Sequence, residues 1–89
     1  MEQDGYPLIG QTTLNGYWIA LGQDDSGNEE LVETWPSALQ AQEEFAQYHN
    51  ALMLNGLNDV TLTTNGDLLI IDGPANEVQT IINQNGLSF

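Results

Sequence analysis

Five carboxylates within ten residues form the densest group of side chains that could do chemistry in this sequence. They are Asp24, Asp25, Glu29, Glu30 and Glu33. Clustered carboxylates can bind a cation, work as an acid–base pair or contact a basic partner. A calcium loop that starts at Asp24 fails on register, because its sixth position is Glu29 instead of Gly and its twelfth is Trp35 instead of Glu. We therefore expect no metal site and favour a basic partner.

Few other residues could take part in catalysis. His49 is the only histidine. A nucleophilic triad could be drawn with Ser26, Ser37 or Ser88, but no glycine pattern of a nucleophile elbow supports it. Two carboxylates could serve a glycosidase, but 89 residues leave little room for a deep substrate cleft. The chain also lacks cysteine, and it has no lysine or arginine to hold a phosphate or an oxyanion. We predict a structural role for His49, no catalytic residue and no cofactor, so that the chain is not an enzyme.

The absence of basic residues is the strongest compositional signal. Thirteen Asp and Glu are ordinary for this length, whereas about ten Lys and Arg would be usual and none is present. The formal net charge of −13 repels nucleic acid and anionic lipid at long range. An acidic surface kept for solubility is one interpretation, but soluble domains usually mix both signs of charge. We therefore expect a basic protein as partner, with no direct contact to nucleic acid or membrane.

Length and segment composition predict one domain over residues 1–89, with residues 1–5 frayed. No run of 18 apolar residues occurs that could form a membrane-spanning helix. The acidic first residues lack the hydrophobic region of a signal peptide. These features predict a cytoplasmic protein, in the host cytoplasm if a phage encodes it.

The first half of the chain predicts a hairpin with an added edge segment. Residues 17–21 and 31–35 are rich in strand-forming side chains, and residues 24–28 form a turn cluster between them. Residues 6–13 read as an extended edge segment, because Pro7 is tolerated only at the edge of a sheet.

A helix is predicted to follow, over residues 37–54. Ser37 and Gln40 make a capping-box pattern, and Asn55-Gly56 is a stop signal. The residues at helical spacing that should face the core are Ala38, Ala41, Phe45, Tyr48 and Leu52. Glu43 and Glu44 begin the exposed side of this helix.

The second half repeats the same order of elements. Alternation at residues 60–63, the Asn65-Gly66 turn and the apolar run 68–71 predict a hairpin with a central second strand. Pro74 opens a helix over residues 74–84, for which Asp72 is a candidate cap. We expect Phe45, Leu68, Ile70 and Ile81 in the core.

These elements predict an α+β fold, with an antiparallel β-sheet, two helices on one face and a ββαββα-like order. Each half is a hairpin, a proline and a helix, with the two prolines, Pro36 and Pro74, 38 residues apart. The other face of the sheet would then meet water or a partner. Trp18 and Trp35 lie on neighbouring strands, so either could be a core residue or, if it faces away from the helices, an anchor for that partner.

Two resemblances follow from these residues. The run Asn15–Trp18, the segment Glu33–Trp35 and a capped helix with Ala41 and Phe45 resemble the small DNA-binding module at the start of tyrosine integrases. That module also runs strand, strand, strand, helix, which supports the topology, but it reads DNA with basic side chains that are absent here. In size and charge, the whole chain resembles the small acidic proteins that phages use against CRISPR effectors, restriction enzymes and other host nucleases.

The first functional hypothesis is therefore an acidic inhibitor or adaptor that occupies the nucleic-acid-binding surface of a basic partner, by nucleic-acid mimicry. The expected partner-binding residues are Asp24, Asp25, Glu29, Glu30, Glu33, Glu43 and Glu44. An alternative is a non-catalytic interaction or dimerisation module that docks through the open sheet face, with a homodimer as one form. A third is an immunity protein for a basic nuclease toxin. Steep salt dependence of binding would separate the first and third from the second.

Overall fold

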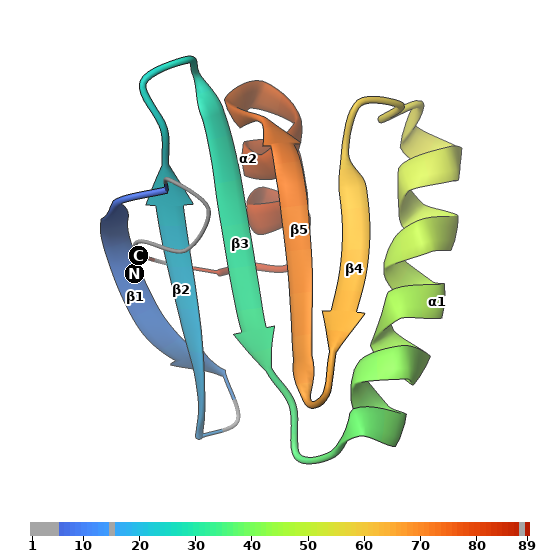
Figure 1. The fold of residues 1–89 in the computed structure, drawn as a ribbon. Coiled ribbons are helices and arrows are strands. Elements are labelled where there is room, and N and C mark those ends of the chain that lie inside the picture. Colours follow the sequence, from blue (N-terminus) through green and yellow to red (C-terminus); the bar gives the residue numbers. More distant parts are fainter. Residues whose placement is uncertain (1–5, 15, 88) are drawn as a thin grey trace.

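The computed structural model describes residues 6–14, 16–87 and 89, so the predicted fraying of residues 1–5 lies outside the described residues. Five strands and two helices follow one another along this part of the chain (Figure 1). They are β1 (Leu8–Leu14), β2 (Tyr17–Gln23), β3 (Asn28–Thr34), α1 (Ala38–Asn55), β4 (Thr61–Asn65), β5 (Leu68–Pro74) and α2 (Ala75–Gln84).

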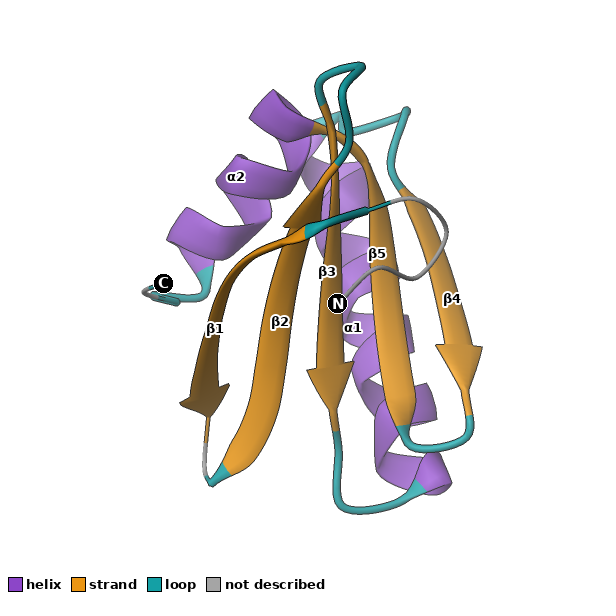
Figure 2. Ribbon diagram, turned by 60° about the vertical axis from the view of Figure 1, so that its left-hand side comes forward, coloured by secondary structure: helices purple, strands orange, loops and turns teal. Residues whose placement is uncertain are grey.

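The strands form one sheet in the order β1-β2-β3-β5-β4, and every neighbouring pair is antiparallel. Both helices lie behind this sheet, on the same face (Figure 2). The predicted α+β class, the antiparallel sheet and the ββαββα-like order are therefore confirmed, with β1 as the added edge strand. The arrangement makes β3 the central strand.

The repeat predicted from the two prolines corresponds to a pseudo-twofold arrangement of the sheet. Val32 of β3 lies opposite Ile70 of β5 in the antiparallel ladder. These residues are 38 positions apart, the same offset as Pro36 and Pro74. The β2–β3 hairpin with α1 and the β4–β5 hairpin with α2 are thus related about the Val32–Ile70 pair.

Local signals set the limits of the helices. The backbone N–H of Gln40 donates to Ser37 Oγ at 3.2 Å, and Gly56 ends α1 in the left-handed conformation with φ of 66°. Both ends of α1 lie within one residue of their predicted positions. The second helix begins at Ala75, after Pro74, with no side-chain capping bond. The N-cap residue is thus Pro74 and not Asp72, which is still part of β5.

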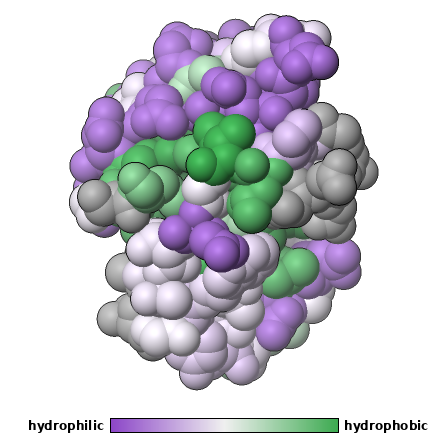
Figure 3. Space-filling view, turned by 90° about the vertical axis from the view of Figure 1, so that its left-hand side faces the viewer, coloured by the Kyte–Doolittle hydropathy of each residue, from purple (hydrophilic) through white to green (hydrophobic). Residues whose placement is uncertain are grey.

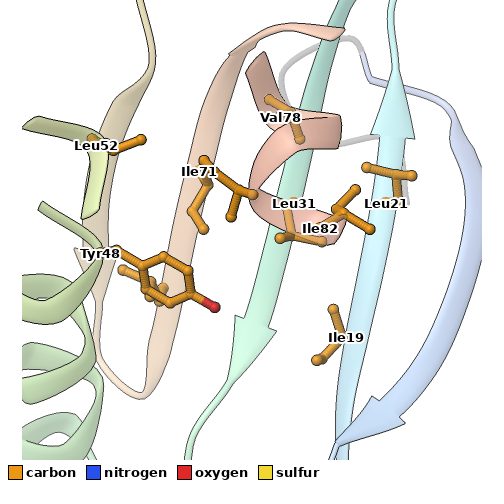
Figure 4. Close-up of a cluster of buried hydrophobic side chains, with 10 residues drawn as sticks. Ile19, Leu21, Leu31, Tyr48, Leu52, Ile71, Val78 and Ile82 are labelled. Atoms are coloured by element: carbon orange, nitrogen blue, oxygen red, sulfur yellow. The ribbon is translucent and has the colours of Figure 1, made fainter. Parts of the chain in front are cut away.

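The main core lies between the sheet and the helices (Figure 4). Its buried members are Ile19, Leu21, Leu31, Tyr48, Leu52, Leu69, Ile71, Val78, Ile81 and Ile82. Of the four core residues expected from the sequence, Ile81 belongs to this cluster. Phe45 is half-buried against it, and Leu68 is half-buried near the end of β5. Ala38 is exposed, contrary to its predicted core position, because it is the first residue of α1.

The opposite face of the sheet also buries apolar side chains. Ala20, Val32 and Ile70 are 0%, 2% and 9% exposed, and each alternates along its strand with a member of the main core. Tyr6 lies over one end of this face, since a Cβ on Gly22 would come within 2.9 Å of Tyr6 Cβ. Ile70 is thus buried as predicted, but on the side away from the helices.

Truncation of Phe45 measures how much this side chain of α1 contributes to the stability of the core. Because its ring is only half-buried, Phe45→Ala should cost about 1–3 kcal/mol of unfolding free energy, less than the roughly 3–5 kcal/mol of a fully buried phenylalanine. Urea denaturation followed by circular dichroism measures this difference. Leu39→Ala is the control, since Leu39 is 68% exposed on the same helix. Equal midpoints for the two variants would remove Phe45 from the core.

Candidate functional site

The turn between β2 and β3 presents Asp24 and Asp25 to solvent. Asp24 Oδ1 accepts the backbone N–H groups of Ser26 and Asn28, both at 2.9 Å, so this side chain holds the turn together. The Asn28 N–H bond is the largest cause of a lowered Asp24 pKa, partly opposed by desolvation and supported by Ser26. Asp25 is exposed beside it, and the two bonds that hold the turn go to Asp24. Asp25 is therefore the freer of the two to contact a partner.

The other three carboxylates of the cluster do not project from the hairpin as expected. Glu29, Glu30 and Glu33 are 4%, 1% and 1% exposed. The reason is the position of β3, which has β2 on one side and β5 on the other and is packed on both faces. In this structure these three side chains lie in the interior and do not form one surface with Asp24 and Asp25.

Neutral donors take the place of the missing cations around the buried Glu29. Gln79 Nε2 of α2 donates to Glu29 Oε1 at 2.9 Å, and Gln23 Nε2 of β2 approaches Oε2 at 3.3 Å. A buried charge is costly unless polar partners surround it. The bond to Gln79 thus attaches α2 to the central strand through a carboxylate.

Glu33 makes a similar connection to α1. The Tyr48 hydroxyl donates to Glu33 Oε2 at 2.7 Å, and Figure 4 shows this hydroxyl pointing from α1 toward β3. Glu33 Oε1 and the nearby Trp35 Nε1 are both buried, and neither makes a hydrogen bond of ordinary geometry. Burial raises the pKa of Glu33, while the Tyr48 and Trp35 donors partly oppose it and the negative charge of Glu44 adds to it. Burial is the main cause of a raised pKa of Tyr48, and the negative charge of Glu33 raises this pKa further.

Glu30 faces the other side of the sheet. It lies directly opposite Asp72 in the β3–β5 ladder, and Asp72 in turn lies opposite Thr61. The two carboxyl groups therefore occupy one face near the same end of the sheet. The sequence alone does not place Glu30 beside Asp72, because the two residues are 42 positions apart and meet only through the pairing of β3 with β5.

That end of the sheet collects carboxylates from three separate segments. The β2–β3 turn, the loop before β4 and the junction of β5 with α2 all lie there, at the upper end in Figure 1. The backbone N–H of Asp59 donates to Glu77 Oε1 at 3.3 Å, which joins two of these segments. We call this surface the acidic end; its residues are Asp24, Asp25, Asp59, Asp72 and Glu77. Viewed from the β1 side, hydrophilic residues also dominate this end (Figure 3).

Glu43 and Glu44 lie elsewhere, in the first half of α1. Because α1 begins at the other end of the sheet, these two side chains do not extend the acidic end as expected. Glu43 is exposed, and Glu44 is half-buried beside a shallow groove of about 230 Å³ between the helices. The groove is lined by Glu44, Gln47, Tyr48, Ala51, Gln84 and Asn85.

His49 is exposed on α1, with its ring stacked on Phe45 at a centroid distance of 6.4 Å. It borders a hollow of about 200 Å³ whose other lining residues are Leu52, Met53, Leu57, Asn58 and Val60. None of these carries a carboxylate, a thiol or a hydroxyl that could complete a catalytic group. Among the described residues, no three histidine or acidic side chains gather as a metal site. The non-catalytic role of His49 stays a prediction.

The two tryptophans lie on opposite faces of the sheet. Trp35 packs half-buried against the main core, whereas Trp18 is 41% exposed on the face away from the helices. Trp18 Nε1 donates to Gln11 Oε1 at 2.8 Å, which fixes the indole against β1. A tryptophan that faces away from the helices was the candidate for a partner anchor. Trp18 has this position and Trp35 does not.

Within the described part of the chain, no helix is long and apolar enough to cross a membrane. Comparisons with protein families, with curated proteins and with solved structures find no match to this chain.

Proposed function

We propose that this chain is an acidic inhibitor or adaptor that binds a basic, nucleic-acid-binding surface of a partner protein through its acidic end. The observation that carries the proposal is the convergence of five carboxylates from three segments on one end of a chain without lysine or arginine. No basic side chain can neutralise these carboxylates internally. Their field therefore acts on a partner, and mainly on its rate of association.

The size of the molecule supports competition with nucleic acid. Its longest extent is 33 Å, comparable to about ten base pairs of duplex at roughly 3.4 Å of rise per pair. A chain with no basic residue also does not bind DNA by itself, so it can occupy a basic groove without bridging to the nucleic acid. The partner classes we propose are CRISPR effectors, restriction enzymes and other nucleases. A basic nuclease toxin would be bound through the same electrostatic attraction to the acidic end.

Two variants that remove equal charge from opposite ends of the sheet test the proposal. The acidic-end variant combines Asp25→Asn, Asp59→Asn and Glu77→Gln. The control variant combines Glu43→Gln, Glu44→Gln and Asp67→Asn, and each set removes three of the thirteen negative charges. Asp24 is kept because it holds its turn, and glutamine at position 77 keeps an acceptor for the Asp59 N–H.

The measurement has two steps. Capture from a lysate at low and moderate salt identifies the partner, and fluorescence anisotropy then follows displacement of a labelled duplex from that purified protein. We expect displacement to weaken steeply with salt and the acidic-end variant to lose about tenfold in affinity, since exposed ion pairs contribute about 0.2–1 kcal/mol each. The control variant should lose less. An acidic partner, or an affinity indifferent to salt and to both variants, would contradict the proposal.

A further inference from the structure

The β1–β2 hairpin lies in the longest stretch of the sequence without a charged residue. From Tyr6 to Gln23, eighteen consecutive residues contain no Asp or Glu, although the chain has thirteen of them. The hairpin also exposes large apolar side chains: Leu8, Ile9, Tyr17 and Trp18 are 40–52% exposed. Viewed from the β1 side, hydrophobic residues form a patch across the middle of this surface (Figure 3). The surface chemistry here is the opposite of that at the acidic end.

The same hairpin contains the less protected edge of the sheet. β1 pairs only with β2, so the outward backbone groups along its other edge have no strand beside them in the described structure. Natural edge strands are usually protected by charges, prolines, bulges or a short length. β1 has a bulge at Ile9, but residues 10–14 continue without charge or proline. By contrast, the other edge strand, β4, is five residues long, is flanked by Asp59 and Asp67, and packs beside α1.

We propose that β1 is the interface of a homodimer, in which the β1 strands of two copies pair antiparallel about a twofold axis and the two sheets become continuous. A strand edge is self-complementary under twofold symmetry, so a second copy supplies the matching donors and acceptors without any other sequence. The interface would cover Leu8 and Ile9, which begin the strand, and Phe89, which packs beside Gly10 and is 44% exposed.

Charge is the reason for choosing a second copy over another partner. Two chains of net charge −13 repel each other, and an interface through the uncharged hairpin brings no carboxylate of residues 6–23 against its copy. A basic partner is drawn instead to the acidic end. Because the paired strands run antiparallel, the two acidic ends lie at opposite ends of the joined sheet. The dimer is independent of the proposed function, and salt separates them: screening should strengthen the dimer and weaken binding to a basic partner.

Sedimentation at a series of protein concentrations and at two salt levels tests the dimer. We expect a species of twice the 9.8 kDa chain mass, with a dissociation constant that falls as salt rises. Ile9→Glu and Thr13→Glu each place like charges at the twofold interface and should raise the dissociation constant at least tenfold. Leu39→Glu is the matched control, because it adds the same charge at a 68%-exposed apolar site on α1. Circular dichroism confirms that each variant is folded.

Single cysteines give a second readout, since the chain contains none. Cysteine at Gln11, Thr12 or Thr13 should form an intermolecular disulfide under mild oxidation at the position nearest the axis, whereas Leu39→Cys should not. A chain that sediments as a monomer at every concentration would overturn the proposal. So would equal dissociation by Ile9→Glu and Leu39→Glu, or cross-linking that is no faster in β1 than at position 39.

Discussion

The free energy of unfolding is expected to rise as the pH falls from about 8 toward 4.5, the reverse of the usual loss of stability toward acid. The cause is Glu33, a 1%-exposed carboxyl group whose pKa burial raises above its ordinary value of 4.5. A raised pKa means that the folded chain holds this proton more tightly than the unfolded chain. The stabilising contribution is therefore complete below about pH 4.5 and is lost as the pH rises through the folded-state pKa.

Asp24 works in the opposite direction but in a different range. Its pKa lies below the ordinary 3.8, so its contribution is present above that value and is lost only as the pH falls further. The reduction of net negative charge toward the isoelectric point of about 4.1 also relieves repulsion between carboxylates. Together these effects place maximal stability on the acid side of neutrality, above the pH range in which Asp24 takes up its proton.

Glu33→Gln should raise the unfolding free energy at about pH 8 by about 1–3 kcal/mol and flatten its pH dependence, because it removes a buried charge while keeping an acceptor for Tyr48. Urea denaturation at several pH values, at low protein concentration, measures both effects. Glu43→Gln is the control, since it removes the same charge from an exposed site on α1 and should leave most of the slope in place. A stability that falls steadily from pH 8 to pH 5, or equal slopes for the two variants, would contradict this account.

Leu31→Ala is expected to be the most damaging single truncation. Leu31 is 0% exposed in the middle of the central strand, opposite Leu21 of β2 and Ile71 of β5 and within the cluster that α2 covers (Figure 4). A Leu→Ala change at a site that cannot collapse costs about 3–5 kcal/mol. The total free energy of unfolding of a domain of this length is roughly 4–13 kcal/mol, so the variant should lose a large fraction of its stability.

Leu54→Ala is the matched control for this truncation. It makes the same chemical change on α1, at a side chain that is 88% exposed, and should alter the unfolding free energy by less than about 0.5 kcal/mol. Chemical denaturation of both variants, at one pH, gives the comparison. A loss below about 1 kcal/mol for Leu31→Ala would mean that the sheet and α2 are not packed around this residue.

Local sequence signals were sufficient to predict the elements of this fold. Ser37 and Gly56 delimit α1, because capping and the left-handed stop depend on groups only a few residues apart. Asn65 and Leu68 close the second hairpin around Gly66 and Asp67 for the same reason. The uniform sign of the charge is likewise a property of composition, and it is the basis on which we propose a basic partner.

The composition of the candidate site depended on strand order, which no local pattern encodes. Glu29, Glu30 and Glu33 read as exposed because charged residues are seldom buried, yet β3 lies between β2 and β5 and its glutamates enter the interior. The partners that make this tolerable, Gln79 and Tyr48, are 50 and 15 residues away.

The acidic end also could not be recognised from the sequence, because it depends on strand order. Asp59, Asp72 and Glu77 lie far from Asp24 and Asp25 in the sequence, and they join them only because antiparallel pairing brings those ends of the strands to one edge. By itself, the sequence determined the elements, their order and the sign of the surface charge. Only the tertiary structure decided which carboxylates are buried and which gather at the acidic end, since burial and proximity are set by contacts between residues distant in the chain.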